Sequence, residues 1–281
     1  MQIQFTKMHG LGNDFVVIDA ISQDIEINTQ FVKALGDRHF GVGFDQLLIV
    51  QAPTQKNMDF KYRIFNASGE EVEQCGNGAR CFARFVIEKK LTNKKIINVE
   101  TCNANITLEL TDDNLVKVDM GPPVFEPKDI PFNTAMLQDS YTIDAGEFGQ
   151  IEINAISMGN PHCVLLVDDV DNTPVEKLGA LLECYPDFPK KVNVGFLQII
   201  DSTHAKLRVY ERGVGETIAC GTGACAAMVA GVLRGKLDKN VTLLLSGGEL
   251  NISWSKNESV IMIGDAVTVF EGKMTWPVTS R

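Results

Sequence analysis

The chain has 281 residues, a length at which a single hydrophobic core stops growing, so two domains are expected. Hydrophobic residues make up 44% of the chain and charged residues 22%, a composition typical of globular proteins. The 36 acidic side chains outnumber the 26 basic ones and give a net charge of −10. This balance disfavours nucleic acid or an anionic membrane surface as the main partner, because both attract concentrated positive charge.

The first residues, MQIQFTKMHGLGND, lack the basic and apolar pattern of a secretory signal. No apolar run approaches the roughly 18 residues that a membrane span requires. We therefore expect a cytoplasmic protein.

Short apolar runs between Gly, Asn and Asp turns predict strands in the first half of the chain. These runs cover 15–20, 46–51, 61–66, 95–101, 106–111 and 115–120. A helical pattern at 78–90 follows the stretch EQCGNGARCF, which sets Cys75 at a Gly-Asn-Gly turn. The prolines of 120–127 cannot continue a strand ladder and predict a connection between domains.

The second half of the chain shows the same alternation of elements. Strands are predicted at 150–158, 163–169, 194–200, 205–211, 241–246, 250–255 and 259–264. The one strong helical pattern, 223–236, follows the stretch IACGTGACAA, which sets Cys220 at a second glycine turn.

The two cysteine stretches belong to an internal repeat. Residues 62–79 match residues 207–224, and Cys75 and Cys220 lie 145 residues apart. Three further matches follow the same order: 42–50 with 194–201, the segment at Asn13 with that at Asn160, and Gly121 with Gly264. Such self-similarity predicts two duplicated halves.

The repeat and the strand-rich pattern together predict the fold class. We expect an α/β (α+β) protein of two pseudo-symmetric domains, each a curled, mostly antiparallel sheet around a central helix. The predicted domains are 1–121, completed by a C-terminal strand at 265–281, and 122–264.

Seven cysteines in a reducing cytoplasm are expected to be thiols. The spacings of Cys75 with Cys81 and of Cys220 with Cys225 differ from those of structural zinc sites, so no metal site is expected. Cys81 is predicted to be helix packing. Three others are predicted to be small buried hydrophobic residues, namely Cys102, Cys163 and Cys184.

The glycine turns give Cys75 and Cys220 a chemical setting. Glycine lets the backbone approach a ligand, and the free N–H groups of a helix start attract anions such as carboxylates. The same field lowers the pKa of a thiol. One such motif is typical of core packing, but two in register favour a function. A thiolate on one face of a tetrahedral carbon and a thiol on the other would invert a stereocentre without a cofactor.

Four segments carry a resemblance to a known family: FTKMHGLGNDFVVID, FNASGEEVEQCGNGARCFARF, SMGNPHCV and ERGVGETIACGTGACA. From Phe5 to the final strand the chain resembles the diaminopimelate epimerase family. This resemblance implies a cofactor-independent two-base epimerase that interconverts LL- and meso-diaminopimelate. It also implies two pseudo-symmetric domains with the active site in the cleft between them, and a homodimer.

The resemblance also implies roles for single residues. Cys75 and Cys220 would be the acid–base groups, prepared by His162 and Glu211. Backbone amides of Gly76, Asn77, Gly221 and Thr222 would hold the reacting α-carboxylate. The guanidinium of Arg212 would bind the distal carboxylate. The remaining substrate-binding residues would be Glu211 together with Asn13, Gln46, Asn66, Asn160 and Asn193.

Two alternatives stay open at this point. A proline racemase or hydroxyproline epimerase of the same fold would also present paired cysteines to an α-carbon. A redox-sensing, carboxylate-binding protein would instead join Cys75 and Cys220 reversibly in a disulfide. The sequence leaves open which cysteine is the base in which direction.

Overall fold

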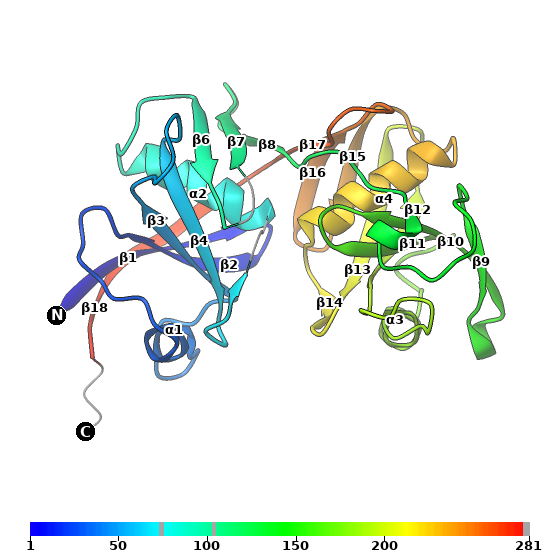
Figure 1. Cartoon of the computed structure of the whole chain (residues 1–281), viewed down its shortest axis with the longest axis horizontal. Coiled ribbons are helices and arrows are strands. Elements are labelled where there is room, and N and C mark those ends of the chain that lie inside the picture. The colour runs from blue at the N-terminus through cyan, green and yellow to red at the C-terminus, as the bar shows by residue number, and fades with distance from the viewer. Residues whose placement is uncertain (73–75, 103–104, 278–281) are drawn as a thin grey trace. The chain divides into compact units, whose positions relative to one another are not determined.

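The computed structural model describes residues 1–72, 76–102 and 105–277 (Figure 1). The chain divides into two compact units, Met1–Val118 with Gly264–Arg281, and Asp119–Ile263. Within the described ranges, no helix is long and apolar enough to cross a membrane. The duplicated domains predicted at 1–121 with 265–281 and at 122–264 stay a prediction.

The first unit is built on one mixed sheet. Its strands are β1 (Gln2–Gly10), β2 (Asn13–Asp19), β3 (Gln46–Gln51), β4 (Phe60–Asn66), β5 (Glu71–Val72), β6 (Ile96–Glu100), β7 (Asn105–Leu110), β8 (Val116–Asp119) and β18 (Val267–Thr275). Strands β2 and β3 are parallel, as are β4 and β6, and the other pairs of this unit are antiparallel. Strand β18, from the C-terminal end of the chain, lies antiparallel along β1.

Two helices cover the two faces of this sheet. Helix α2 (Gly76–Glu88) is buried along most of its length and packs against β1, β2, β3, β7 and β18. Helix α1 (Thr29–Gly36) places Phe31, Val32 and Leu35 in a core cluster with alternate residues of β2 and β3. Because both faces are covered, the central strands are continuous apolar runs rather than alternating ones.

The second unit repeats this plan. Its strands are β9 (Tyr141–Asp144), β10 (Gln150–Ser157), β11 (Pro161–Leu166), β12 (Asn193–Ile199), β13 (His204–Glu211), β14 (Gly215–Thr217), β15 (Asn240–Leu245), β16 (Gly248–Ser253) and β17 (Ile261–Gly264). Strands β11 and β12 are parallel, as are β13 and β15. Helix α4 (Gly221–Leu233) is apolar on all sides and fully enclosed along Ala224–Gly231, as expected of a central helix. Helix α3 (Val175–Glu183) covers the other face.

The strand registers of the two units also correspond. Phe15 pairs with Gln46 between β2 and β3, and His162 pairs with Asn193 between β11 and β12. The same shift of 147 residues relates both members of the pair. Equal topology and equal register show that the two units repeat one structure. The predicted match of 42–50 with 194–201 aligns Gly43 with Gly195, a shift of 152 residues, and is therefore five residues out of this register.

The structure adds elements that the sequence patterns do not predict. Helices α1 and α3 span only eight and nine residues, and strand β1 was not expected. The prediction for two cysteines is wrong: Cys102 and Cys184 are exposed. Both lie at or beyond the ends of elements, where no neighbouring layer covers them. Cys81 and Cys163 are buried, as predicted.

Candidate active site

Of the two candidate catalytic cysteines, the structure describes Cys220, which lies at the start of helix α4. Cys220 is the N-cap residue, with extended backbone angles of φ −126° and ψ 110°, and its side chain is buried. The Thr222 hydroxyl lies 3.7 Å from Cys220 Sγ. A Cβ placed on Gly223 would lie 3.2 Å from Sγ, closer than an ordinary contact. The glycine therefore gives the thiol room to lie over the first turn of the helix.

Burial and charge decide the protonation of this thiol. Burial raises the pKa of Cys220 well above its ordinary value, and the nearby Glu211 carboxylate raises it further. Hydrogen bonds from the Gly223 amide and the Thr222 hydroxyl lower the same pKa, but their effect is smaller. Cys220 is therefore a protonated thiol at neutral pH.

The end of strand β13 carries two further predicted residues. Glu211 accepts a hydrogen bond of 2.6 Å from the Thr217 hydroxyl of β14, so its carboxylate is held beside Cys220. The exposed Arg212 follows; its guanidinium donates to the Lys190 carbonyl at 3.1 Å. Its backbone N–H donates to the Asn193 side-chain oxygen at 3.0 Å.

The starts of strands β11 and β12 bring in the remaining residues of this unit. His162 is buried and its Nε2 lies 3.0 Å from Asn160 Oδ1, so Nε2 carries the ring proton. Burial lowers the pKa of His162 to about 3, and the Arg212 charge acts in the same direction. Asn193 donates to the Pro161 carbonyl at 2.9 Å. This unit thus holds a neutral imidazole, a thiol and a carboxylate.

The start of helix α2 is the corresponding place in the first unit. Gly76 and Asn77 open the helix and are buried, and Cys75 lies outside the described residues. Asn77 donates to the Asn13 side-chain oxygen at 3.3 Å. The fully buried Arg80 donates to the Asn77 side-chain oxygen at 3.0 Å. These contacts fix the Asn77 side chain one residue into the helix.

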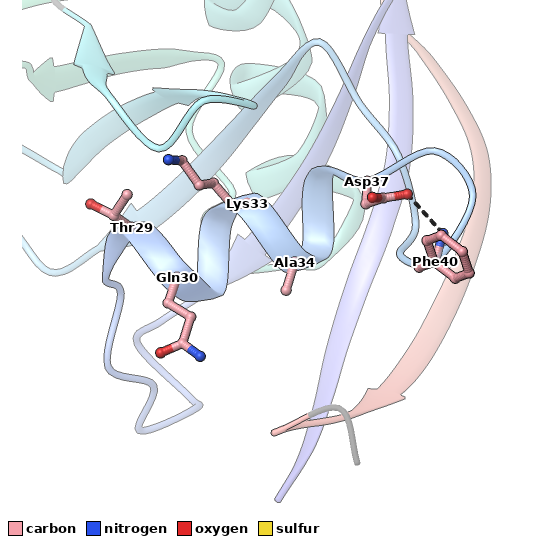
Figure 2. A pocket seen from close by; sticks show the side chains of 6 residues that line it. All are labelled: Thr29, Gln30, Lys33, Ala34, Asp37 and Phe40. Atoms are coloured by element: carbon pink, nitrogen blue, oxygen red, sulfur yellow. Dashed lines mark hydrogen bonds between the residues drawn. The ribbon is translucent and has the colours of Figure 1, made fainter. Parts of the chain in front are cut away.

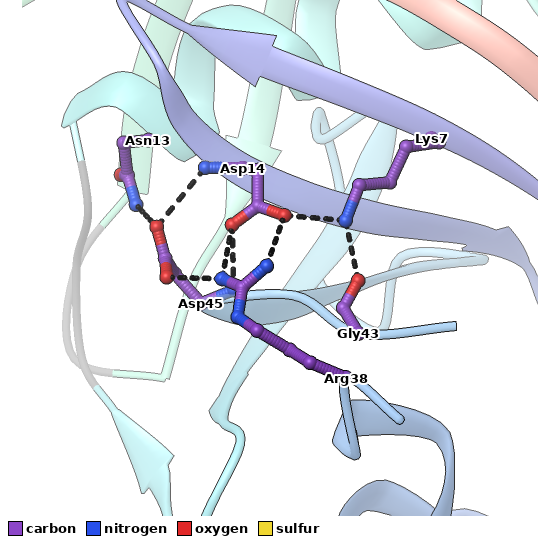
Figure 3. Close-up of polar contacts among 6 residues, drawn as sticks. All are labelled: Lys7, Asn13, Asp14, Arg38, Gly43 and Asp45. Atoms are coloured by element: carbon purple, nitrogen blue, oxygen red, sulfur yellow. Dashed lines mark hydrogen bonds and ion pairs between the residues drawn. The ribbon is translucent and has the colours of Figure 1, made fainter. Parts of the chain in front are cut away.

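An ionic cluster orders Asn13 from its other side (Figure 3). Asn13 donates to Asp45 Oδ2 at 2.9 Å, and Arg38 bridges Asp45 and Asp14 at 2.7 Å each. Lys7 also pairs with Asp14. Hydrogen bonds from Arg38 and Lys7 outweigh burial and hold the pKa of Asp14 well below its usual range. The sequence reasoning missed Asp14, Arg38 and Asp45; the acidic residues flanking Asn13 and Gln46 were the available signal.

Gln46 and Asn66 complete the predicted set in the first unit. The Gln46 side-chain amide donates to Asn66 Oδ1 at 3.0 Å, across the strand pair in which the two residues are opposite. Gln46 Oε1 is buried and has no hydrogen-bond partner in the described part of the chain. Buried acceptors normally have a hydrogen-bond donor as partner. An amine of a bound ligand would supply such a donor to Gln46 Oε1.

Each unit brings its predicted residues to one edge of its sheet. Parallel strands start at the same edge, and the next, antiparallel strand ends there. Gln46 and Asn66 lie opposite each other at this edge, and Asn13 contacts Asn77 at the start of α2. Asn160, His162 and Asn193 lie together at the starts of β11 and β12, and Glu211 lies beside Cys220 at the start of α4. Both units therefore place polar side chains at a helix N-terminus, an anion-binding position.

One pocket among the described residues lies away from the predicted site residues. An open pocket of about 650 Å³ lies along α1 and is lined by Thr29, Gln30, Lys33, Ala34, Asp37 and Phe40 (Figure 2). None of these is a predicted site residue. No group of three His, Cys, Asp or Glu side chains in the described ranges could hold a metal ion.

Solved structures share the fold of this chain. A Bacillus anthracis phenazine biosynthesis protein of the PhzF family matches with a TM-score of 0.70, at 16% identity over 98% of this chain and 99% of that one. A hydroxyproline epimerase from Agrobacterium vitis matches with a TM-score of 0.70, at 14% identity over 97% and 92% of the two chains. At such identity the likeness concerns the fold alone, and it confirms the predicted fold class.

Sequence relatives are much closer. The family model described as diaminopimelate epimerase matches residues 5–126 and 154–269. Diaminopimelate epimerases of Azotobacter vinelandii and Pseudomonas paraeruginosa are 55% and 57% identical to it over 275 and 276 residues. Each alignment covers 98% of this chain and 99% of the relative. On this similarity, and with its repeated helix-start motifs, the chain belongs to the diaminopimelate epimerase family.

Proposed function

We propose that this protein is an isomerase that interconverts LL-2,6-diaminopimelate and meso-diaminopimelate, a step toward lysine and peptidoglycan. The observation that carries the proposal is the full-length identity of 55–57% to enzymes of that name. The site geometry supports it, because each unit sets a glycine-flanked helix start beside ordered amides and, in the second unit, a thiol.

The proposed chemistry needs two acid–base groups, one for each face of the α-carbon. Cys75 and Cys220, one from each unit, fill these roles. The protonated state of Cys220 in the free protein is the form that donates a proton to the carbanion. Amides of Gly76 and Asn77, and of Gly221 and Thr222, bind the α-carboxylate and stabilise the charge that develops when the α-proton leaves.

His162 and Glu211 act on the Cys220 thiol rather than on the substrate carbon. The neutral imidazole has an unprotonated Nδ1, an acceptor for which a thiol proton is a suitable donor. The Glu211 carboxylate disfavours a thiolate, because two negative charges would face each other. Burial and the Glu211 carboxylate keep the proton on Cys220 until the substrate's own charges enter the site.

The substrate's distal ammonium and carboxylate are assigned to polar side chains. Arg212 binds the distal carboxylate, and the amide side chains of Asn13, Gln46, Asn66, Asn160 and Asn193 bind the polar ends of the molecule, with the Glu211 carboxylate near the amine. We further propose that the enzyme is a cytoplasmic homodimer without a cofactor, as its family implies.

Turnover in heavy water tests this function. Purified protein should convert LL-diaminopimelate to meso-diaminopimelate, with solvent deuterium in the product early and unlabelled recovered substrate, because each thiol exchanges only its own proton. Cys75→Ala and Cys220→Ala should each abolish conversion with an unchanged circular dichroism spectrum. Cys184→Ala, at an exposed cysteine, is the matched control and should keep full activity.

Three outcomes would contradict the proposal. Turnover of proline in place of diaminopimelate would favour the proline racemase alternative. Binding of diaminopimelate without α-proton exchange would favour a non-catalytic carboxylate-binding protein. Early deuterium in recovered substrate and product alike would mean one shared base instead of two.

A further inference from the structure

Both units carry an arginine–glutamate pair at the same place, on the hairpin that precedes the helix start. In the first unit, Arg63 Nε and Nη2 each donate to one carboxylate oxygen of Glu71 at 2.7 Å. In the second unit, Arg208 Nε and Nη2 donate to Glu216 at 2.6 and 2.7 Å. The repeat shift of 145 residues relates both arginines and both glutamates. A two-bond fork of this kind fixes the relative orientation of the two side chains as well as their distance.

Each fork crosses its hairpin diagonally. Glu71 lies opposite Phe65 between β5 and β4, and Glu216 lies opposite Tyr210 between β14 and β13. Each arginine stands two residues before that aromatic residue, on the same face of its strand. The Arg208 and Glu216 side chains are only 24% and 21% exposed, which protects the pair from competition with water.

The strand that each fork holds leads directly to a proposed catalytic thiol. Strand β5 has two residues and β14 has three, so their ladders to the neighbouring strand are short. Only three residues separate each strand from its helix, 73–75 in the first unit and 218–220 in the second, and the last of the three is the cysteine. In the second unit, whose three connecting residues are all described, so short a connection transmits a displacement of the strand to Cys220.

In the second unit the fork also supports the carboxylate beside the thiol. Arg208 Nη1 donates to the Val170 carbonyl at 2.9 Å and so ties the hairpin to the segment before α3. The Thr217 hydroxyl donates to Glu211 across the same hairpin, one residue after Glu216. A shift of β14 would therefore move Thr217, Glu211 and Cys220 together.

We propose that Glu71 with Arg63, and Glu216 with Arg208, are positioning residues that each hold one thiol in line with its face of the substrate carbon. This inference rests on the proposed epimerase function. It assigns the two pairs separately, because the arginine and the glutamate of each fork belong to the same hairpin.

Glu71→Gln and Glu216→Gln test the proposal, since glutamine keeps the side-chain shape and loses the charge. Each variant should lower kcat by roughly ten- to a hundredfold with KM within about threefold of the wild-type value, because misplacement of a reacting group acts on the chemical step. Glu109→Gln is the matched control: Glu109 pairs with Lys117 across β7 and β8, at 2.9 Å, and leads to no helix start. Its kcat should stay within about twofold of the wild-type value.

Isotope effects separate positioning from general loss of structure. LL- and meso-substrates deuterated at the α-carbons lose their deuterium to different thiols. A variant that misplaces one thiol slows C–²H cleavage for one epimer and reprotonation for the other. We therefore compare the α-deuterium isotope effect on kcat/KM for the LL-substrate with that for the meso-substrate. Relative to the wild-type value, the ratio of these two isotope effects should rise in one of the variants Glu71→Gln and Glu216→Gln and fall in the other.

If the glutamine variants fail to fold, Glu71→Asp and Glu216→Asp replace them in the test. Aspartate keeps the charge but shortens the side chain, so each aspartate variant should shift the ratio in the direction expected for the glutamine variant at the same position. Wild-type kcat in both carboxamide variants, or a ratio that is unchanged or moves the same way in both, would overturn the proposal. Absence of turnover in the wild-type protein would instead overturn the proposed function.

Discussion

At the scale of the single residue, burial decides the charge of His162. The imidazole ring is 1% exposed and hydrogen-bonded to Asn160. Because of this burial, and to a lesser extent the Arg212 charge, the pKa of His162 falls to about 3. In the unfolded chain the same side chain titrates near its ordinary value of about 6.5. Between these values the unfolded state binds the additional proton, so protonation favours unfolding as the pH falls.

The free energy of unfolding therefore depends on pH through this residue. The contribution of His162 is fully present above about pH 6.5 and is lost as the pH falls toward 3, at about 1.4 kcal/mol per pH unit. His162→Gln should remove this part of the acid sensitivity, so that urea unfolding between pH 6.5 and 4.5 shows a shallower decline than in the wild-type protein. Equal slopes in both proteins would mean that the imidazole titrates normally in the fold.

At the scale of the element, the first turn of α4 is shaped around the thiol. Gly223 is the third helical residue, where a Cβ would lie 3.2 Å from both Cys220 Sγ and a Val209 methyl group. Glycine costs helix stability relative to alanine, by roughly 0.5–1 kcal/mol in a helix interior. A helix that served packing alone would gain from the larger residue.

Gly223→Ala should separate activity from stability. The new methyl group displaces Sγ by a few tenths of an ångström, and we expect kcat to fall about tenfold while the melting temperature stays within a few degrees. Gly195→Ala on β12 is the control, since its nearest contacts would be 3.6 Å and ordinary. Full activity with Gly223→Ala would show that the thiol position is not limiting.

At the scale of the whole molecule, the order of the segments along the chain can be changed by circular permutation. The first unit is made of two segments whose outer ends meet: Gln2 is paired with Thr275, and the Trp276 N–H donates to the Met1 carbonyl at 2.8 Å. The start of β1 and the end of β18 are therefore adjacent, and a short flexible linker can join them without bending either strand.

A circular permutant tests the proposed domains. A chain that starts at Pro122, ends at Gly121 and joins the old ends by a short glycine-serine linker should fold with near-native activity, because Gly121 has open space around it. A permutant opened between Val164 and Leu165, within β11, should fail to fold. Loss of folding in the first permutant would argue against 1–121 with 265–281 as one domain.

Local features of the fold were predictable from the sequence because they depend on near neighbours. The strand runs of β3 and β4 and the central helices α2 and α4 follow from patterns within a few residues. Helices α1 and α3 were not predictable, because such short helices take their stability from the sheet face they cover. The exposure of Cys102 and Cys184 likewise depends on neighbouring layers, which no local pattern reports.

The sequence by itself determined the duplication, the glycine turns at Cys75 and Cys220, and the family, since all three lie in contiguous residues and their spacing. Only the tertiary structure decided the ordering of Asn13 by Asp45, the neutral state of His162 and the hairpin forks of Arg63 and Arg208. The physical reason is that hydrogen bonds across strands and the desolvation of buried groups depend on segments far apart in the chain.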